Sequence, residues 1–497
     1  MNNIKIFYTA LNEDGKNAKA GEIRANLEID EVTEAAISPP TLVSKISLVQ
    51  GSSLGEDKDP LVYSYYVKAD DQKVPRLLIA KNYPKGLNSE TPSESTARYV
   101  VYKPISDSSD WVAVNDGGQG ADFGYNWSQL TNLRGITQIN EHYVFALNLD
   151  GTKIYTLPTS ALETGTASSG PTELIDLAEF LKAEAGYTLK GVKILAGETQ
   201  LFVLYSQVAD PYDPQKAYAD SKLVSIPVDF EDGGKPKAQE PTILDVGKNA
   251  TDLVAAYDGK PLKLFITCLG GPLTPGVSNG TESKLQVVDF KKKTVTTAFT
   301  GLPSDANSPL TRDSKGLNFT ALAVNQSGSS LIILTTALDA KGAGVYWRLY
   351  KSAVYTVVEK VDATIEDLEA SSKLLDYTLD NPDKLGDPGL FWDVFFENAA
   401  QRLWLIRGVS IQCTRGPAYP EGPGNAPDAS KDRRILTGSA LYGSDKININ
   451  SVEIVSETIY GSTRRQSQGR ALIFEAGEGG HPVPALGKGT QAFKNRG

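Results

Sequence analysis

Oxygen-bearing side chains flank a glycine-rich segment of a type that binds calcium. Residues 117–122 read GGQGAD and match the first six positions of the calcium-binding nonapeptide GGxGxDxUx. Asn115, Asp116 and Asp122 would supply oxygen ligands, of which Ca²⁺ takes about six to eight. The eighth position of that motif is a large apolar residue, whereas this chain has Gly124. We therefore expect no cofactor, with calcium at these three residues as the alternative.

Histidine and cysteine chemistry is narrowly limited in this chain. It holds two histidines, His142 and His481, and two cysteines, Cys268 and Cys413. Three-histidine zinc or copper sites are thereby excluded, and a Ser-His-Asp triad would need one of these two histidines. The cysteines allow one disulfide at most, and we expect two buried thiols. The 60 acidic residues leave carboxylate-only chemistry open.

Tyrosine and arginine side chains occur in the long polar connections of the chain. Both residue types are enriched in binding hot spots, and aromatic faces also suit sugar rings. The alternative is that these side chains serve ordinary packing and surface. The predicted ligand-binding residues are Tyr212, Asp213, Tyr218, Arg415, Tyr419 and Arg433. A protein or a glycan is the expected partner.

The net charge argues against two classes of partner. The 497 residues carry a formal net charge of -10, which disfavours nucleic acid and anionic membrane surfaces. No apolar stretch is long enough to insert into a membrane, and the N-terminus lacks a signal-peptide core. A chain with this start is cytoplasmic or has lost a leader. Its richness in Gly, Ser, Thr and Asn favours an extracellular or cell-surface protein.

One strand-turn-strand phrase recurs along the chain and predicts an all-β fold. Its second strand returns at intervals of 58 to 82 residues, which indicates one repeated supersecondary unit. The second strands are expected to begin near Leu61, Tyr143, Leu201, Leu264, Leu331 and Leu403, with a seventh at residues 470–476. The third strands are expected to begin near Thr152, Ser221, Ser283, Val345 and Arg433, and 98–106 supplies a third or fourth strand of the first unit. Fourth strands are expected near Thr294 and Tyr355, so each unit is a four-stranded antiparallel meander.

The two ends of the chain complete each other. Residues 4–16 read as a third strand and residues 23–30 as a fourth, so the chain begins within a unit. It also ends within one, at residues 470–476. Pairing residues 1–30 with the C-terminal strands would close a ring and remove exposed sheet edges, leaving residues 476–497 as a tail.

In this period and strand phrasing, the chain resembles the β-propeller superfamily over almost its whole length. The resemblance implies one domain, residues 1–497, with seven four-stranded blades closed by the terminal strands. Six blades are the alternative, because residues 446–461 form either one strand or two, and two unrelated sandwich domains are a third reading. No subfamily is identified. Short helices are expected at 172–186 and 363–376, between blades.

The long connections indicate where function lies. In an antiparallel blade, second-to-third and between-blade connections leave from one face. The long connections assigned to that face are 206–221, 270–283, 414–432, 115–132 and 380–389. We expect a non-catalytic, exported or surface-displayed scaffold that binds a protein or glycan there. A carboxylate hydrolase or lyase at the channel mouth, with or without calcium, and a self-assembling structural subunit are the alternatives.

Overall fold

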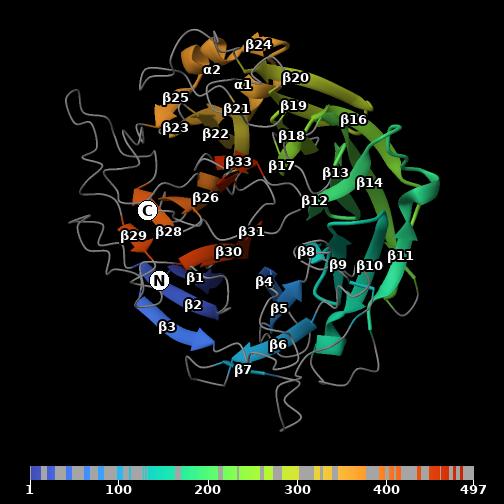
Figure 1. Cartoon of the computed structure of the whole chain (residues 1–497), viewed down its shortest axis with the longest axis vertical. Helices are drawn as coiled ribbons and strands as arrows, with labels where there is room; N and C mark the ends of the chain where they lie inside the picture. Colours follow the sequence, from blue (N-terminus) through green and yellow to red (C-terminus); the bar gives the residue numbers. More distant parts are fainter. Residues whose placement is uncertain are drawn as a thin grey trace.

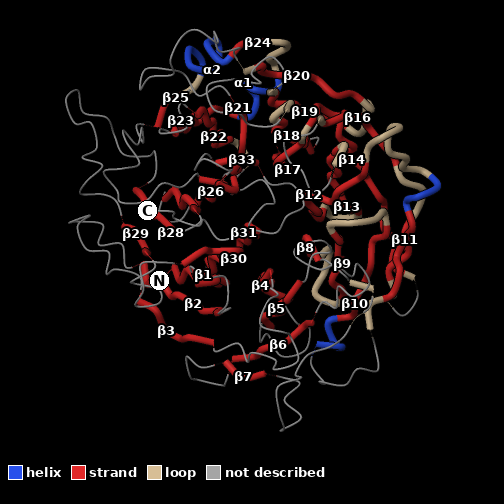
Figure 2. Tube along the Cα trace, in the orientation of Figure 1, coloured by secondary structure: helices blue, strands red, loops and turns tan. Residues whose placement is uncertain are grey.

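The structure is a computed structural model in which the backbone of the strands named below is described along the whole chain. Side chains are described for residues 127–372, with gaps at 128, 131–132, 163–169, 211–216, 232–233, 257–261, 272–282, 302–317, 325–327 and 337–347, and for residues 67, 76, 78 and 394. Nearly all regular elements are strands, as Figure 2 shows. No helix within this part of the chain has the length and apolarity that crossing a bilayer requires.

The strands form antiparallel sheets of four or five strands, seven in all among the described residues, and one two-stranded sheet. The first sheet joins both ends of the chain, in the order β3-β2-β1-β30-β31 (Thr41–Ile46, Lys19–Leu27, Asn2–Asn12, Ile447–Thr458 and Gly461–Gln468). Next come β4 to β7 (Leu61–Val67, Arg76–Asn82, Arg98–Pro104 and Trp111–Ala113) and β8 to β11 (Leu133–Thr137, Tyr143–Asn148, Lys153–Pro158 and Thr172–Asp176). The fourth sheet contains β12, β13, β14, β15 and β16 (Thr188–Ala196, Gln200–Val208, Tyr218–Phe230, Pro236–Ala238 and Thr242–Lys248).

The remaining sheets continue in chain order. The fifth contains β17, β18, β19 and β20 (Ala250–Tyr257, Leu262–Cys268, Lys284–Asp289 and Thr294–Thr300) and the short parallel strand β24 (Ala363–Thr364). The sixth contains β21, β22, β23 and β25 (Asn318–Val324, Ser330–Leu338, Val345–Ala353 and Lys373–Leu375). The seventh is β26 to β29 (Phe391–Glu397, Arg402–Arg407, Ser410–Arg415 and Arg434–Thr437), and β32 pairs with β33 (Phe474–Ala476 and Pro482–Pro484). The helices are η1, η2, α1 and α2 (Thr159–Leu162, Leu177–Glu179, Val354–Val358 and Ile365–Ser371).

The sheets follow one another around a common centre, with the first strands β4, β8, β12, β17 and β26 on the inner side (Figure 1). This arrangement of antiparallel meanders is a β-propeller fold. The N- and C-terminal strands share one sheet, because β1 pairs with β2 on one side and with β30 on the other.

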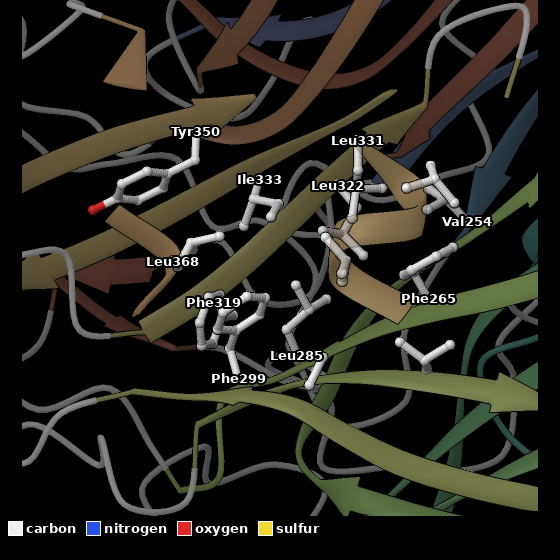
Figure 3. Packing of buried hydrophobic residues seen from close by; sticks show 14 of the residues in the cluster. Val254, Phe265, Leu285, Phe299, Phe319, Leu322, Leu331, Ile333, Tyr350 and Leu368 are labelled. Atoms are coloured by element: carbon white, nitrogen blue, oxygen red, sulfur yellow. The ribbon is translucent and has the colours of Figure 1, made fainter. Parts of the chain in front are cut away.

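Apolar clusters lie between consecutive sheets. The cluster between the fifth and sixth sheets contains Phe265, Phe299, Phe319 and Leu331, each without solvent exposure, and helices α1 and α2 close its outer side (Figure 3). Similar clusters join the second to the third sheet, the third to the fourth and the fourth to the fifth. Inner strands such as β9, β13 and β18 therefore bury side chains on both faces of their sheets, which explains the nearly continuous apolar runs in the sequence.

Much of the predicted strand pattern is confirmed. The second strands predicted near Tyr143, Leu201, Leu264, Leu331 and Leu403 are β9, β13, β18, β22 and β27. The third strands of these sheets up to Val345 are β10, β14, β19 and β23, residues 98–106 supply the third strand β6, and β20 is the fourth strand expected near Thr294. At the N-terminus, β1 and β2 are the third and fourth strands of their sheet, as expected, and β3 adds a fifth.

Several predicted strands were wrong. Leu61 begins β4, the first strand of its sheet, and the second is β5. Residues 470–476 contain β32, which pairs only with β33 and belongs to no four-stranded sheet, whereas β30 is one continuous strand. Arg434 opens a fourth strand, β29, because the third, β28, follows β27 after two residues.

Of the three predictions around the helices, two were wrong and one is confirmed in part. Residues 354–358 form α1 instead of a strand, since Val354 and Val357 lie three residues apart on one buried helical face. Residues 172–186 do not form the predicted helix, because Thr172–Asp176 pairs with β10 as strand β11 and only η2 follows. The helix predicted at 363–376 is confirmed only over Ile365–Ser371, as α2, whose Thr364 and Asp367 form a capping box; the flanking residues form the strands β24 and β25.

Removal of one core side chain should measure how much the cluster between the fifth and sixth sheets stabilises the fold. Phe265→Ala should lower the free energy of unfolding by about 3–5 kcal/mol, because it leaves a cavity in a close-packed core. Phe180→Ala is the matched control, since this phenylalanine is 44% exposed and its loss should change stability by less than about 0.5 kcal/mol. Urea unfolding followed by circular dichroism gives both values, and equal losses would contradict this packing.

Candidate functional site

The connections between strands divide into two faces. We call the side on which the first strand of each sheet begins the upper face, and the other the lower face. In an antiparallel meander, second-to-third and between-sheet connections lie on the upper face. The connections 209–217, 269–283, 114–132 and 376–390 belong there, as predicted. The long connection 416–433 instead joins β28 to β29, a third to a fourth strand, and leaves from the lower face.

A β-bulge recurs at one place in the first strands, close to the upper face. In each of five first strands, one extra residue interrupts the pairing with the second strand. The bulged residues are Arg134, Val192, Thr251, Thr320 and Trp392. Bulges redirect side chains and often border functional sites, so this row marks the floor of the upper face.

Threonines fill the floor between β17 and β21. Thr251 Oγ1 donates to the carbonyl oxygen of Thr320, 2.9 Å away in the next sheet, and lies 2.8 Å from Thr267 Oγ1. Thr320 Oγ1 in turn donates to the Leu334 carbonyl at 3.1 Å. These hydroxyls are buried, so they join neighbouring sheets and are not open to a ligand.

Two serines repeat the same link between sheets. Ser221 Oγ accepts the N–H of Ala250 at 3.0 Å, and Ser283 Oγ accepts the N–H of Phe319 at 2.9 Å. Each serine is the first residue of an S-K-L phrase at a third strand. Each N–H donor, Ala250 or Phe319, directly precedes a bulged threonine of the next sheet. Ala250 and Phe319 keep their register partners in the second strand, Cys268 and Thr335, and each serine oxygen gives a buried N–H at the edge of the sheet a hydrogen-bond partner from the preceding sheet.

Asp252 connects three sheets and follows the bulge of β17. Its carboxylate accepts from Lys193 Nζ at 2.6 Å and from the N–H of Leu322 at 2.8 Å. Lys193 follows the bulge of β12, and Leu322 lies just beyond the bulge of β21. The Asp252 side chain has no solvent exposure and also accepts the Leu253 N–H, so it holds the first strands together and cannot act as an exposed acid or base.

The described residues hold no catalytic constellation that we can identify. No group of three metal-binding side chains occurs among them. Burial raises the pKa of the Cys268 thiol well above its usual range, so this cysteine is an unreactive core residue. His142 is exposed in the turn between β8 and β9, on the lower face, whereas Asp252 lies near the upper face.

One serine-containing segment in an upper-face connection was not recognised from the sequence. Residues 276–280 read GVSNG, the G-x-S-x-G spacing of hydrolase nucleophiles. That motif acts on a turn from a strand into a helix, whereas this segment joins the antiparallel strands β18 and β19. The spacing alone therefore gives no basis for assigning a nucleophile.

The structure separates the predicted ligand-binding residues. Tyr218 begins β14 with 4% exposure and packs against Val208 and Leu269, so it belongs to the core and is not available to a ligand. Arg415 ends β28 on the lower face, away from Tyr218 on the upper face. The other predicted residues lie outside the described part of the chain: Tyr212, Asp213, Tyr419, Arg433, Asn115, Asp116 and Asp122.

Comparison with known proteins shows a similarity in fold and nothing further. No protein-family model and no curated protein matches the sequence. Among solved structures, the chain is similar to a Pseudomonas aeruginosa periplasmic gluconolactonase at 9% identity and a TM-score of 0.44, covering 83% of this chain and 92% of that one. The Dos1 propeller matches at 7% identity and a TM-score of 0.33, covering 71% and 70%. Drosophila Semaphorin 1a extracellular domains match at 10% identity and a TM-score of 0.38, covering 82% and 85%.

Neutralising Asp252 should destabilise the fold strongly. Asp252→Asn removes the ion pair with Lys193 and leaves a largely buried ammonium without its counter-charge, which costs about 3 kcal/mol. Asp245→Asn is the matched control, because Asp245 pairs with Lys222 at the same 2.6 Å but is 65% exposed. That change should cost less than about 1 kcal/mol in urea unfolding. Similar losses for both variants would contradict the role of Asp252.

Stability should fall in acid. Burial would raise the pKa of Asp289, but hydrogen bonds from Lys263 Nζ and the Lys292 N–H hold the pKa below its ordinary value. A carboxylate with a lowered folded pKa stabilises the fold above its unfolded pKa of about 3.9, and this contribution is lost as pH falls through the folded pKa. The melting temperature should therefore drop below about pH 4. Asp289→Asn should reduce that drop, and an unchanged drop would show that Asp289 does not contribute.

Proposed function

We propose that this protein is a non-catalytic binding propeller whose upper face takes a protein or glycan. The observation that carries the proposal is the separation between that face's connections and its floor. The long connections at 114–132, 209–217, 269–283 and 376–390 rise from the upper face. Beneath them, Asp252, Thr251 and Ser221 use their oxygens to join sheets. The connections, and not the channel residues, therefore offer the contacts.

The proposed architecture is a closed ring of seven blades. Seven sheets of four or five strands occur among the described residues, and each corresponds to one blade. The shared sheet of β1 and β30 supports closure by the two ends of the chain, which removes two exposed edges. A rigid ring suits a scaffold, because loops keep their relative positions when the sheets beneath them cannot move.

Tyr212 and Asp213 are the proposed contacts, since they lie within the connection between β13 and β14. Calcium at Asn115, Asp116 and Asp122, in the connection between β7 and β8, is proposed as an optional support of the same face. We propose that the protein is exported or surface-displayed, in keeping with a face that recognises other molecules.

A glycan array tests the binding face. Tyr212→Ala should weaken binding to the recognised glycans by about tenfold or more, because aromatic contacts dominate such interfaces. Tyr419→Ala is the matched control, since it lies in the lower-face connection 416–433 and should leave binding unchanged. Equal effects of the two substitutions, or loss only with Tyr419→Ala, would overturn the upper-face assignment. Absence of any bound glycan would exclude glycans and leave a protein ligand.

A further inference from the structure

Two of the four exposed large apolar side chains in the described part of the chain lie at the lower face. They are Phe230 and Tyr355, with exposures of 36% and 58%. Phe230 ends the third strand β14, and Tyr355 lies in α1, directly after the third strand β23. Val361 lies farther from the lower face, because β24 pairs with Phe299 and Thr300 at the upper end of β20. The fourth, Phe180, follows β11 at the upper face.

Among the described residues, the charge on the lower face is divided between two halves. The half formed by the third and fourth sheets exposes four acids, and the half formed by the fifth sheet and the α1–β24 segment presents four bases. The acids are Glu141, Glu198, Asp229 and Glu231, and the bases are Lys291, Lys292, Lys293 and Lys360. The acidic half also carries Lys235 and Lys237, and the basic half also carries Glu359 and Asp362.

Each half combines its charges with apolar side chains. Phe230 lies between Asp229 and Glu231, which accept from Gln239 and Lys237 at 2.9 and 3.0 Å and are thereby held in place. The lysine turn 291–293 is fixed by the Lys292 N–H, which donates to Asp289. The Asp362 N–H donates to the Thr297 carbonyl at 2.7 Å, which ties the segment carrying Val361 to the edge of β20. The two halves therefore present their side chains from ordered backbone.

We propose that the lower face binds a second copy of this chain about a two-fold axis. In such an isologous dimer the acidic half of one copy lies on the basic half of its partner, and the reverse contact follows by symmetry. The same pairing covers Phe230 with Tyr355 across the axis. A stable dimer buries about 800 Å² per partner, an area that requires contact across several sheets, and the two halves span the third to the sixth.

The dimer directs both upper faces outward. Two ligand-binding faces on one particle convert a second binding event into an intramolecular one and increase avidity. The lower-face contact does not depend on the proposed upper-face ligand, so a failure of either leaves the other standing.

Analytical ultracentrifugation with a charge swap tests this interface. At ~100 μM and low salt the wild-type protein should sediment as a dimer. Lys291→Glu/Lys292→Glu should raise the dimer dissociation constant at least about tenfold, because it places acids against acids. Lys182→Glu, which makes a like-signed change on the upper face, is the control and should leave the dimer intact.

Mixing supplies the decisive comparison. Glu198→Lys/Asp229→Lys should also be monomeric alone, and an equimolar mixture with Lys291→Glu/Lys292→Glu should restore a dimer. In the mixed dimer both charge contacts are complementary, one as in the wild type and the other with its signs exchanged. Melting curves matching wild type show that the variants fold. A monomeric wild-type protein at this concentration, a dimer insensitive to the lysine reversal, or a mixture that stays monomeric would each overturn the proposal.

Discussion

The carboxylate of Asp252 is the interaction on which the arrangement of sheets most depends. It is fully buried, and it bonds to a lysine of the preceding sheet and to a backbone N–H of the following one. A buried charge is tolerated only when its partners are present, so the three sheets must keep their relative positions for this carboxylate to keep its ion pair and hydrogen bonds. Apolar packing between sheets is less directional and would permit sliding. The polar links therefore fix the relative positions of the sheets, whereas the apolar clusters hold the sheets together without fixing those positions.

The repeated bulge explains why these links fall at one level. An extra residue in a first strand is itself unpaired and bends the strand locally, while its neighbours keep their partners in the second strand. Ser221 and Ser283 each accept the N–H that precedes such a bulge. Gly191 in β12 illustrates how tight the approach is, because a Cβ at that position would collide with the carbonyl oxygen of Asn148 in the preceding sheet. Upper-face loops consequently rise from a floor whose geometry is set by contacts between sheets.

Much of the fold could be predicted from local sequence, and the reasons for the failures are physical. Phrases such as residues 192–206 place apolar runs on both sides of a turn, which is enough to predict β12 and β13. At residues 403–415 only Gly408 and Val409 separate β27 from β28, so the two strands were predicted as a single second strand. The connection that follows β28 was therefore assigned to the upper face instead of the lower face. Thr172–Asp176 has helical spacing, but pairing with β10 outweighs that local preference.

The site was less predictable, because its bonds join residues far apart in the chain. Ser221 and Ala250 are separated by 29 residues, and Asp252 and Leu322 by 70, with no local pattern that pairs them. Tyr218 looked like an exposed loop residue, since its neighbours are polar, yet it packs against Leu269 from the next strand pair. Repetition is the signal that could have helped: the S-K-L phrase precedes a first strand with a bulged threonine twice.

Native-state hydrogen exchange at the amides of Ala250, Phe319 and Leu322 tests this account most directly. Ala250 and Phe319 lie at strand starts, where exchange through local fraying is ordinarily fast, and Leu322 lies within β21. If inter-sheet bonds unite the sheets, the three amides should exchange together, with the free energy of global unfolding. Exchange of each amide at a separate and much lower free energy would show that the sheets open independently, and would contradict the account.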